Sequence, residues 1–423
     1  MKINLKHILP VFSFLLMLPL LVACGGSDDE PQVNPDPVVP PSVNPEVEGR
    51  TVLVYMAAAY GTGSDLSKFA EDDLAEMEEI VAKMDLSKNH LLIYCDDCKS
   101  NSATLRRLYN DNGKAAYETL RTYESNRNST GLDETIEVFQ DAFNAYPGSS
   151  YGLVYWSHGG GWMPQDASTR WIGYDKGREM NIDDFATALQ SAPHLDFLLF
   201  DCCFMQCVEV AYELRDYADY FIGSPTEIPG PGGPYTEILP AFYSDNPGLE
   251  IPAAYYNSYE RYYDTTMTGP QVIMGGDTYD ADGNWRVGVS ISSIKSSALA
   301  SLAQATADAL KTVEASLTLY QMRSGNFDYD YSNSYCLYDF QVLMETVLSE
   351  SRLEEWKSYL DDALAFWKTT PLNYTGPNMR TFSMEKAKCG ITHYIPKSTQ
   401  STATAAHRNT SWYKDAGILA LGW

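Results

Sequence analysis

Two segments of the sequence decide the fold, LVYWSHGGGW at residues 153–162 and LLFDCCFM at residues 198–205. Each begins with an apolar run typical of a strand that is buried on both faces of a parallel sheet. The first run ends at His158 on a glycine-rich loop, and the second ends at Cys203. Because the carboxyl ends of parallel strands meet at one edge of a sheet, we expect the two side chains to be neighbours. A histidine beside a cysteine predicts a base and a thiol nucleophile.

Five apolar runs and the helical patterns between them define the expected sheet. The expected strands are residues 51–59, 91–96, 151–156, 196–200 and 219–223. The expected helices are residues 72–83, 132–146, 182–190 and 208–216. Strands that alternate with helices predict an open, mainly parallel α/β sheet with helices on both faces.

The C-terminal half has a less regular pattern. It predicts strands at residues 286–292 and 390–395 and helices at 297–318, 337–348 and 352–367. We expect this half to complete the sheet and to add a helical subdomain from about residue 250 onward.

The N-terminus has the pattern of an export signal. Lys2 and Lys6 precede an apolar run, and small residues then lead to Cys24. Residues 1–23 therefore predict a secretory signal peptide. The segment before Cys24 resembles a bacterial lipobox, which implies cleavage before Cys24 and acylation of its sulfur; an ordinary signal peptide is the alternative. Residues 27–30 resemble the acidic tag that exports lipoproteins of the Bacteroides group, which implies a surface-exposed outer-membrane lipoprotein.

A proline-rich stalk follows the signal, over residues 24–49, and the folded part spans residues 50–423. The whole chain has 44% hydrophobic and 13% aromatic residues, which is enough apolar surface for a large core in the folded part. The formal net charge of −26 argues against nucleic acid as a partner, and against contact with an anionic membrane except through a lipid anchor.

The eight cysteines do not suit a full disulfide framework. With Cys24 assigned to lipid, an odd number remains, so at least one thiol is expected to be free. Cys95 and Cys98 form one CxxC pair, but the sequence lacks a second pair with zinc-site spacing. A local disulfide or two inert thiols is the favoured interpretation of this pair.

Several motifs together resemble the clostripain family of C11 cysteine peptidases. The strongest are YWSHGGGW at residues 155–162 and DCCFMQCVEVAYEL at residues 201–214; weaker matches are YMAA at 55–58, YCLYDF at 335–340 and GITHYIP at 390–396. The resemblance implies a caspase-like α/β/α fold and cleavage of proteins or peptides after Arg or Lys by a His–Cys dyad.

Carried over by position, the resemblance makes His158 the base and Cys203 the nucleophile, with Cys202 as the competing thiol. The backbone N–H groups of Gly159 and Cys203 would form the oxyanion hole. A helix that begins after Met205 would point its positive end toward Cys203 and lower the pKa of the thiol.

Substrate-binding residues are also implied. Asp201 would lie at the floor of the S1 pocket and pair with a basic P1 side chain, with Trp162, Ser224 and Glu227 as further pocket residues. Pro231 lies near the position of the family's second pocket acid, so the strength of the preference for Arg over Lys is left open.

Relatives are often zymogens that cut themselves after a basic residue downstream of the histidine. Arg170, Lys176 and Arg178 are the candidates for self-cleavage. Clostripain itself requires calcium, but the acidic residues 96–97 and 28–30 do not match a calcium-loop pattern. We therefore expect no metal or other cofactor, and calcium is the alternative that the family analogy implies.

Two other functions are compatible with the residues. The first is a catalytically weak surface lipoprotein that uses its 30 tyrosines and eight tryptophans to bind peptides or glycans. The second is a thiol–disulfide or zinc protein built on Cys95, Cys98, Cys202, Cys203 and Cys207.

Overall fold

The computed structural model describes residues 47–58, 65–96, 102–164, 170–264, 286–313, 317–331, 335–375 and 380–423, without the side chains of residues 163, 164, 170, 171 and 380. All of them belong to one unit of the chain, Val38–Trp423. The predicted signal peptide, Cys24 and most of the stalk lie outside the described residues. No helix among the described residues has the length and apolar character needed to cross a bilayer.

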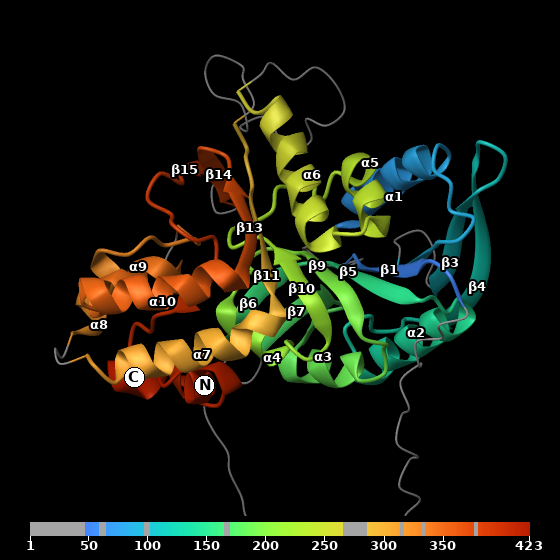
Figure 1. The fold of residues 1–423 in the computed structure, drawn as a ribbon. Helices are drawn as coiled ribbons and strands as arrows, with labels where there is room; N and C mark the ends of the chain where they lie inside the picture. Colours follow the sequence, from blue (N-terminus) through green and yellow to red (C-terminus); the bar gives the residue numbers. More distant parts are fainter. Residues whose placement is uncertain are drawn as a thin grey trace, which may run out of the picture. The chain divides into compact units, whose positions relative to one another are not determined.

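A nine-stranded sheet forms the centre of the molecule, in the order β13-β11-β10-β9-β5-β1-β2-β3-β4 (Figure 1). Its five middle strands are parallel, which confirms the predicted fold class. These strands are β1 (Arg50–Ala57), β2 (His90–Asp96), β5 (Ser150–Trp156), β9 (Leu195–Asp201) and β10 (Ala218–Gly223). Each lies within two residues of its expected position.

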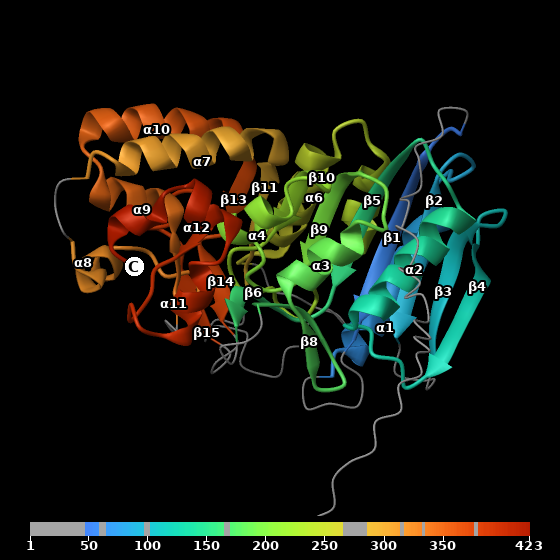
Figure 2. The same cartoon turned by 90° about the horizontal axis from the view of Figure 1, so that it is seen from below.

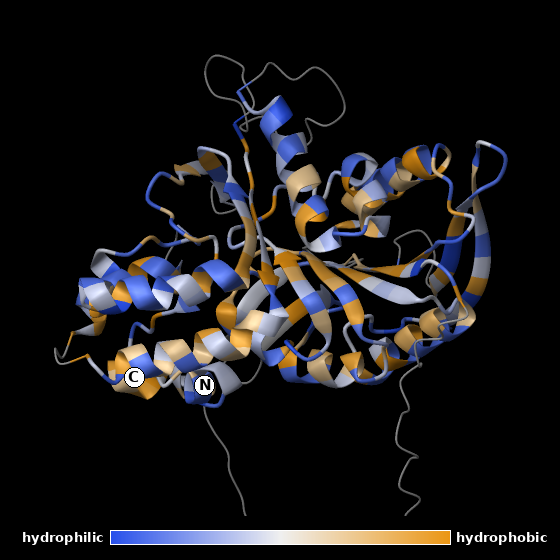
Figure 3. Ribbon diagram, in the orientation of Figure 1, coloured by the Kyte–Doolittle hydropathy of each residue, from blue (hydrophilic) through white to orange (hydrophobic). Residues whose placement is uncertain are grey.

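Helices cover both faces of this sheet, because successive residues of the strands point to opposite sides. In β1, Leu53 and Tyr55 belong to one apolar cluster, whereas Val52 and Val54 belong to another. The first face carries α2 (Leu132–Ala145), α3 (Ile182–Leu189), α4 (Val208–Glu213) and α7 (Ser296–Leu310), and the second carries α1 (Ser67–Val81), α5 (Tyr235–Ile238) and α6 (Pro247–Tyr262). Figure 3 shows hydrophobic residues along the central strands between these two layers.

Antiparallel strands extend the sheet at both edges. They are β3 (Ser102–Asn110) and β4 (Ala115–Ser125) beside β2, and β11 (Ser290–Lys295) and β13 (Leu364–Thr369) beside β10. The sequence did not predict β3 and β4. Residues 364–367 were expected to continue a helix, and that prediction is wrong, because pairing with β11 overrides their local preference.

The remaining C-terminal elements gather beyond the β13 edge of the sheet (Figure 2). Their core is continuous with the first helix layer, since Trp356, Trp412 and Trp423 belong to the same cluster as Phe200 of β9. The elements are α8 (Leu319–Ser324), β12 (Leu337–Asp339), α9 (Phe340–Val347), α10 (Glu350–Ala363), β14 (Leu372–Thr375), β15 (Arg380–Ser383), β16 (Thr392–Tyr394), α11 (Thr402–His407) and α12 (Ser411–Asp415). Residues 337–339, expected to be helical, pair instead with β16.

A small sheet follows β5 directly. It consists of β6 (Gly159–Pro164), β7 (Arg170–Asp175) and β8 (Arg178–Met180), in that order. The sequence did not predict these strands. They hold the glycine-rich segment after His158 in an antiparallel ladder.

Candidate active site

The register between β5 and β9 aligns the two decisive segments. Trp156 is directly opposite Asp201 in this parallel pair. His158 and Cys203 each follow two residues later, so the two segments leave the sheet side by side. Their contact is close at Gly159, where an added Cβ would lie 2.5 Å from the carbonyl oxygen of Cys203. Only glycine permits this approach.

The two adjacent cysteines have different environments. The Cys202 thiol is buried and donates a hydrogen bond to the carbonyl oxygen of Tyr155 at 3.2 Å. Of the cysteines that the structure describes, Cys203 alone is not fully buried. Burial raises the pKa of Cys202 well above its usual value, and the charge of Asp201 adds to this effect. The geometry therefore favours Cys203 over Cys202 as the nucleophile.

The turn that carries Cys203 is strained. Phe204 has a φ of +62°, in the left-handed region that bulky residues rarely adopt. Its N–H donates to the carbonyl oxygen of Thr226 at 3.0 Å, and the N–H of Gln206 donates to that of Ser224 at 3.1 Å. The loop after β10 thus holds the turn in a conformation of the kind that concentrates at functional sites.

Ile228, in the same loop, covers the sulfur of Cys203. Its N–H donates to the Cys203 Sγ at 3.3 Å, and its carbonyl oxygen lies 3.9 Å from that atom. Burial raises the pKa of the Cys203 thiol to about 12, and the negative charge of Glu227 contributes in the same direction. In this conformation the thiol is neutral at pH 7.

This pKa is opposite to the one expected from a helix dipole. Helix α4 begins only at Val208, five residues after Cys203, and it spans six residues. Dipole effects fall off within the first turn of a helix. The expectation that a helix beginning after Met205 lowers the pKa of Cys203 is therefore wrong for this structure, where burial dominates.

His158 lies directly before β6, the first strand of the small sheet. Its carbonyl oxygen accepts the N–H of Gly173 at 2.9 Å, and its ring meets the ring of Tyr174 edge-on at 6.3 Å between centroids. Ser157, just before it, donates to the carbonyl oxygen of Ala57 at 2.7 Å and accepts from the N–H of Tyr174 at 3.1 Å. Strands β1 and β7 together fix the position of the histidine.

Asp201 is a buried carboxylate with a full set of protein donors. It accepts the N–H of Gly233 at 2.9 Å and the hydroxyls of Tyr235 and Tyr255 at 3.0 and 3.2 Å. Burial raises the pKa of Asp201 despite these hydrogen bonds. The Pro-Gly-rich loop after Ile228 therefore covers the residue that was predicted to bind a basic side chain.

A second buried acid, Asp73 of α1, stands close to Asp201. A Cβ on Gly232 would lie 3.4 Å from the Oδ2 of Asp73 and 3.5 Å from that of Asp201, so both carboxylates face this glycine. Asp73 accepts the indole N–H of Trp156 at 2.7 Å. Burial raises the pKa of Asp73, followed by the charge of Asp201. In the sequence, Asp73 cannot be told from the other acids of α1.

The other predicted pocket residues divide between loop and core. Glu227 is half-buried beside Cys203, whereas the buried hydroxyl of Ser224 braces its own loop through Thr226. Trp162 is only 1% exposed and packs edge-on against Tyr394, with 4.6 Å between ring centroids. The indole has no surface left for a substrate, so we do not assign Trp162 to the pocket.

Two tyrosines of the C-terminal half complete the surroundings of the thiol, and the sequence did not predict them. Burial raises the pKa of both Tyr335 and Tyr374 to about 12, with contributions from Glu227 and Cys203. The ring of Tyr335 lies 4.9 Å from that of Phe204. The amide of Asn373, next to Tyr374, bonds the hydroxyl of Thr226 at 3.2 Å. The β14 segment thus supports the loop over Cys203.

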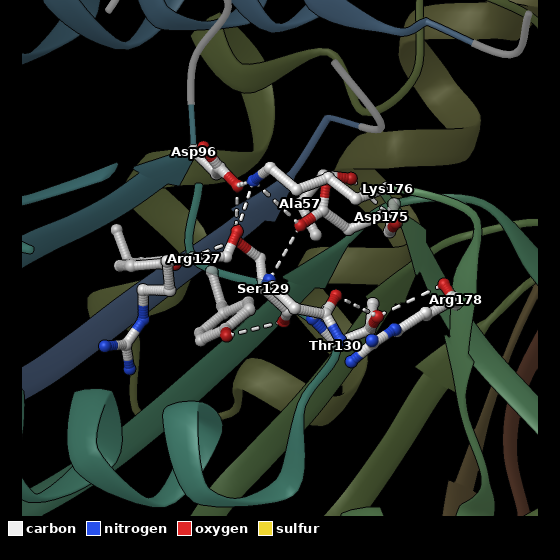
Figure 4. A network of polar contacts seen from close by, with 12 residues as sticks. Ala57, Asp96, Arg127, Ser129, Thr130, Asp175, Lys176 and Arg178 are labelled. Atoms are coloured by element: carbon white, nitrogen blue, oxygen red, sulfur yellow. Dashed lines mark hydrogen bonds and ion pairs between the residues drawn. The ribbon is translucent and has the colours of Figure 1, made fainter. Parts of the chain in front are cut away.

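The candidate self-cleavage residues lie in the hairpin formed by β7, β8 and the turn between them. The Lys176 Nζ bonds the Oδ2 of Asp96 at 2.7 Å and that of Asp175 at 3.3 Å (Figure 4). Lys176 and Gly177 have φ values of +46° and +77°, as in a tight hairpin turn. Arg178 is exposed at the end of this turn, and the side chain of Arg170 lies outside the described residues. Lys176 is therefore a structural cation in a bent segment, unlike an extended substrate.

No group of three or more His, Cys, Asp or Glu side chains among the described residues is arranged to hold a metal ion. Cys95 is buried at the end of β2, and Cys98 lies outside the described residues. Whether these two cysteines form a local disulfide or remain two inert thiols is therefore not tested.

Comparison with known proteins places the chain in a family. The model of the clostripain family, Peptidase_C11, matches residues 54–415. Among curated proteins, none is significantly similar to this chain.

Several solved structures are similar to the chain. A secreted C11 cysteine protease from Bacteroides thetaiotaomicron, in complex with an irreversible peptide inhibitor, is 38% identical, with a TM-score of 0.76 over 88% of this chain and 99% of that one. An inactive zymogen C11 protease from Parabacteroides distasonis is 28% identical, with a TM-score of 0.72 over 88% and 99%. A cysteine protease of B. fragilis is 35% identical, with a TM-score of 0.53 over 60% and 99%.

The family model covers most of the chain, and the solved relatives share its sheet and flanking helices. The chain belongs to the clostripain family and is a C11 cysteine peptidase.

Proposed function

We propose that this peptidase cleaves protein or peptide chains after Arg, and also after Lys, with His158 as the base and Cys203 as the nucleophile. The observation that carries the proposal is the β5–β9 register, in which Trp156 pairs with Asp201. His158 and Cys203 each follow two residues after this pair, at the same edge of the sheet. The partly buried state of Cys203 supports it, because the neighbouring Cys202 is turned into the core.

The chemistry follows from these positions. When a substrate displaces the Ile228 peptide from the sulfur, His158 takes the thiol proton and the Cys203 thiolate attacks the scissile carbonyl carbon. The N–H groups of Gly159 and Cys203 stabilise the oxyanion. His158 then protonates the leaving amine, and water hydrolyses the thioester to release the acyl product and restore the thiol.

Recognition of a basic P1 side chain is assigned to Asp201 together with Asp73. Two buried carboxyl groups that face one glycine are unfavourable unless they hold a proton or meet a cation. A guanidinium would supply that cation through directional hydrogen bonds, and an ammonium would do so less specifically. For this the loop at Gly232 and Gly233 must yield to the incoming side chain.

A matched panel of fluorogenic peptides with Arg, Lys or Ala at P1 tests this function. We expect kcat/KM for Arg to exceed that for Ala by about 100-fold or more, because only a basic P1 side chain supplies the cation that the two buried carboxyl groups need. Cleavage only after a non-basic residue would contradict the proposed role of the acidic pocket, but not the peptidase activity. Absence of hydrolysis, with or without calcium and reductant, would favour the peptide- or glycan-binding alternative.

Export of this chain would agree with the description of one similar structure as a secreted protease. We propose that acylated Cys24 holds the peptidase at the outer surface of the cell. Fractionation of cells that express Cys24→Ala tests this anchor: the variant is expected in the medium or in soluble fractions, whereas the wild-type chain is expected in membranes. An equal distribution of both would argue for an ordinary signal peptide.

Self-cleavage after a basic residue between His158 and β9 is also part of the proposal. Because Lys176 lies in a tight turn and Arg178 follows that turn directly, we favour Arg170, at the start of β7, as the residue before the cut bond. No metal or other cofactor is required by the steps above.

A further inference from the structure

A buried polar cluster connects the C-terminal segment to both catalytic segments. We define it by Glu209 of α4, His393 and Tyr394 of β16, and His407 of α11. Each of these side chains is at most 2% exposed. The chemistry proposed above uses none of them, although burial of an ionisable group is costly unless its hydrogen bonds are made.

The cluster is joined to the segment that carries Cys203. The N–H of Thr392 donates to the carbonyl oxygen of Gln206 at 3.0 Å, so β16 pairs with the turn after the nucleophile. Two residues further along β16, the N–H of Tyr394 donates to the Oε1 of Glu209 at 2.9 Å. The same oxygen lies 3.2 Å from the Nε2 of His407. Glu209 therefore fastens the helix after Cys203 to β16 and to α11.

The cluster is also joined to the segment that carries His158. Trp162, four residues after the histidine, packs against His407 with 4.8 Å between ring centroids. A Cβ on Gly161 would lie 2.9 Å from the Sγ of Cys207 and 3.0 Å from the carbonyl oxygen of Phe204. The His407 ring thus touches Trp162 on one side and Glu209 on the other.

The hydrogen bonds assign the proton positions in the cluster. The indole N–H of Trp412 can only donate, so the Nε2 of His393, at 3.1 Å, accepts. The proton of His393 is then on Nδ1, which donates to the carbonyl oxygen of Tyr394 at 2.8 Å. Burial lowers the pKa of His393 to about 4, so this ring is neutral at pH 7. Glu209 is consequently left to accept from His407 and from the N–H of Tyr394.

The hydrogen bonding of the Glu209 carboxyl group is incomplete. The Oε2 atom is buried and has no hydrogen-bond partner within the described part of the chain. A carboxyl group in this situation stabilises the fold less than an apolar side chain of the same size would.

We propose that Glu209 and His407 are positioning residues that hold the His158 segment and the Cys203 turn in mutual alignment. The proposal rests on the assignment of His158 and Cys203 as the reacting pair. Neither positioning residue touches the substrate: His407 acts through Trp162 on one segment, and Glu209 acts through α4 and β16 on the other.

The test compares His407→Phe with Glu213→Ala. His407→Phe keeps an aromatic ring against Trp162 but removes the N–H that bonds Glu209. We expect kcat to fall by about 10-fold or more with KM unchanged, as for loss of alignment between reacting groups. Glu213 is on the same helix and also bonds the C-terminal segment, through the N–H and hydroxyl of Ser411 at 3.2 Å. Glu213→Ala is therefore expected to lower Tm without lowering kcat.

Glu209→Gln supplies the conservative rescue, because its amide oxygen still accepts from Tyr394 and His407. We expect its kcat within about twofold of the wild type, with an unchanged pH–rate profile. Equal losses of kcat in His407→Phe and Glu213→Ala, or a fall in Tm alone in His407→Phe, would overturn the proposal. If His407→Phe does not fold, Trp162→Phe takes its place with the same expected kcat loss. Failure of the proposed function itself is distinguishable, because the wild type would then show no hydrolysis that depends on Cys203.

Discussion

Cys203→Ala is expected to lower kcat/KM for an Arg peptide by roughly 1,000-fold or more, because no other thiol can take its place in covalent catalysis. The neighbouring Cys202 is buried, and its thiol is bonded to the carbonyl oxygen of Tyr155. Steady-state hydrolysis of the fluorogenic panel measures the effect. If self-cleavage occurs, this variant is expected to stay a single chain on prolonged incubation, which a denaturing gel would show.

Cys202→Ala is the matched control for this prediction. It removes a thiol one residue away and leaves the sulfur of Cys203 in place. We expect its activity to stay within a few-fold of the wild type, with a loss of stability of about 1 kcal/mol from the small cavity. Activity that survives in Cys203→Ala but vanishes in Cys202→Ala would exchange the roles of the two residues.

Asp201→Asn is expected to lower kcat/KM for an Arg substrate by about 100-fold and to leave the slow cleavage of an Ala substrate unchanged. The amide keeps the shape of the side chain but cannot neutralise a guanidinium. The comparison of Arg and Ala peptides separates loss of recognition from loss of chemistry, because only recognition depends on P1.

Tyr255→Phe controls for disturbance of the buried network. It removes the hydroxyl that donates to the Oδ1 of Asp201 at 3.2 Å but keeps the carboxyl group. We expect this variant to retain the preference for Arg over Ala. If Asp201→Asn lowers both substrates equally, Asp201 supports the turn of Cys203 and does not recognise P1.

The central parallel strands were predictable because strands buried on both faces must be apolar throughout. The hairpin of β3 and β4 was not, since β4 is largely exposed and its residues carry no buried pattern. Strand β13 was taken for helix because residues 364–367 favour a helix locally, and only pairing with β11 makes them extended. Strand β13 thus depends on a partner that is distant in the sequence.

The candidate site also contains residues that the sequence predicts and residues that it does not. The meeting of the His158 and Cys203 segments could be predicted because each follows a buried strand within a family-like motif. Asp73, Ile228 and Glu209 could not, since each reaches the site through the packing of elements that are far apart in the sequence. Trp162 was misassigned for a related reason: an aromatic residue after a glycine-rich loop suits a pocket wall, but His407 and Tyr394 enclose it here.

Covalent labelling with an arginine chloromethyl ketone tests the central claim most directly, because the reagent needs both the acidic pocket and an activated thiol. After the reaction, proteolysis and mass spectrometry identify the modified residue. We predict a single label on Cys203, none on Cys202, and a labelling rate that falls by about 100-fold in His158→Ala. A label on another cysteine would contradict the assignment of His158 and Cys203. Equal labelling by the corresponding alanine chloromethyl ketone would contradict the assignment of Asp201.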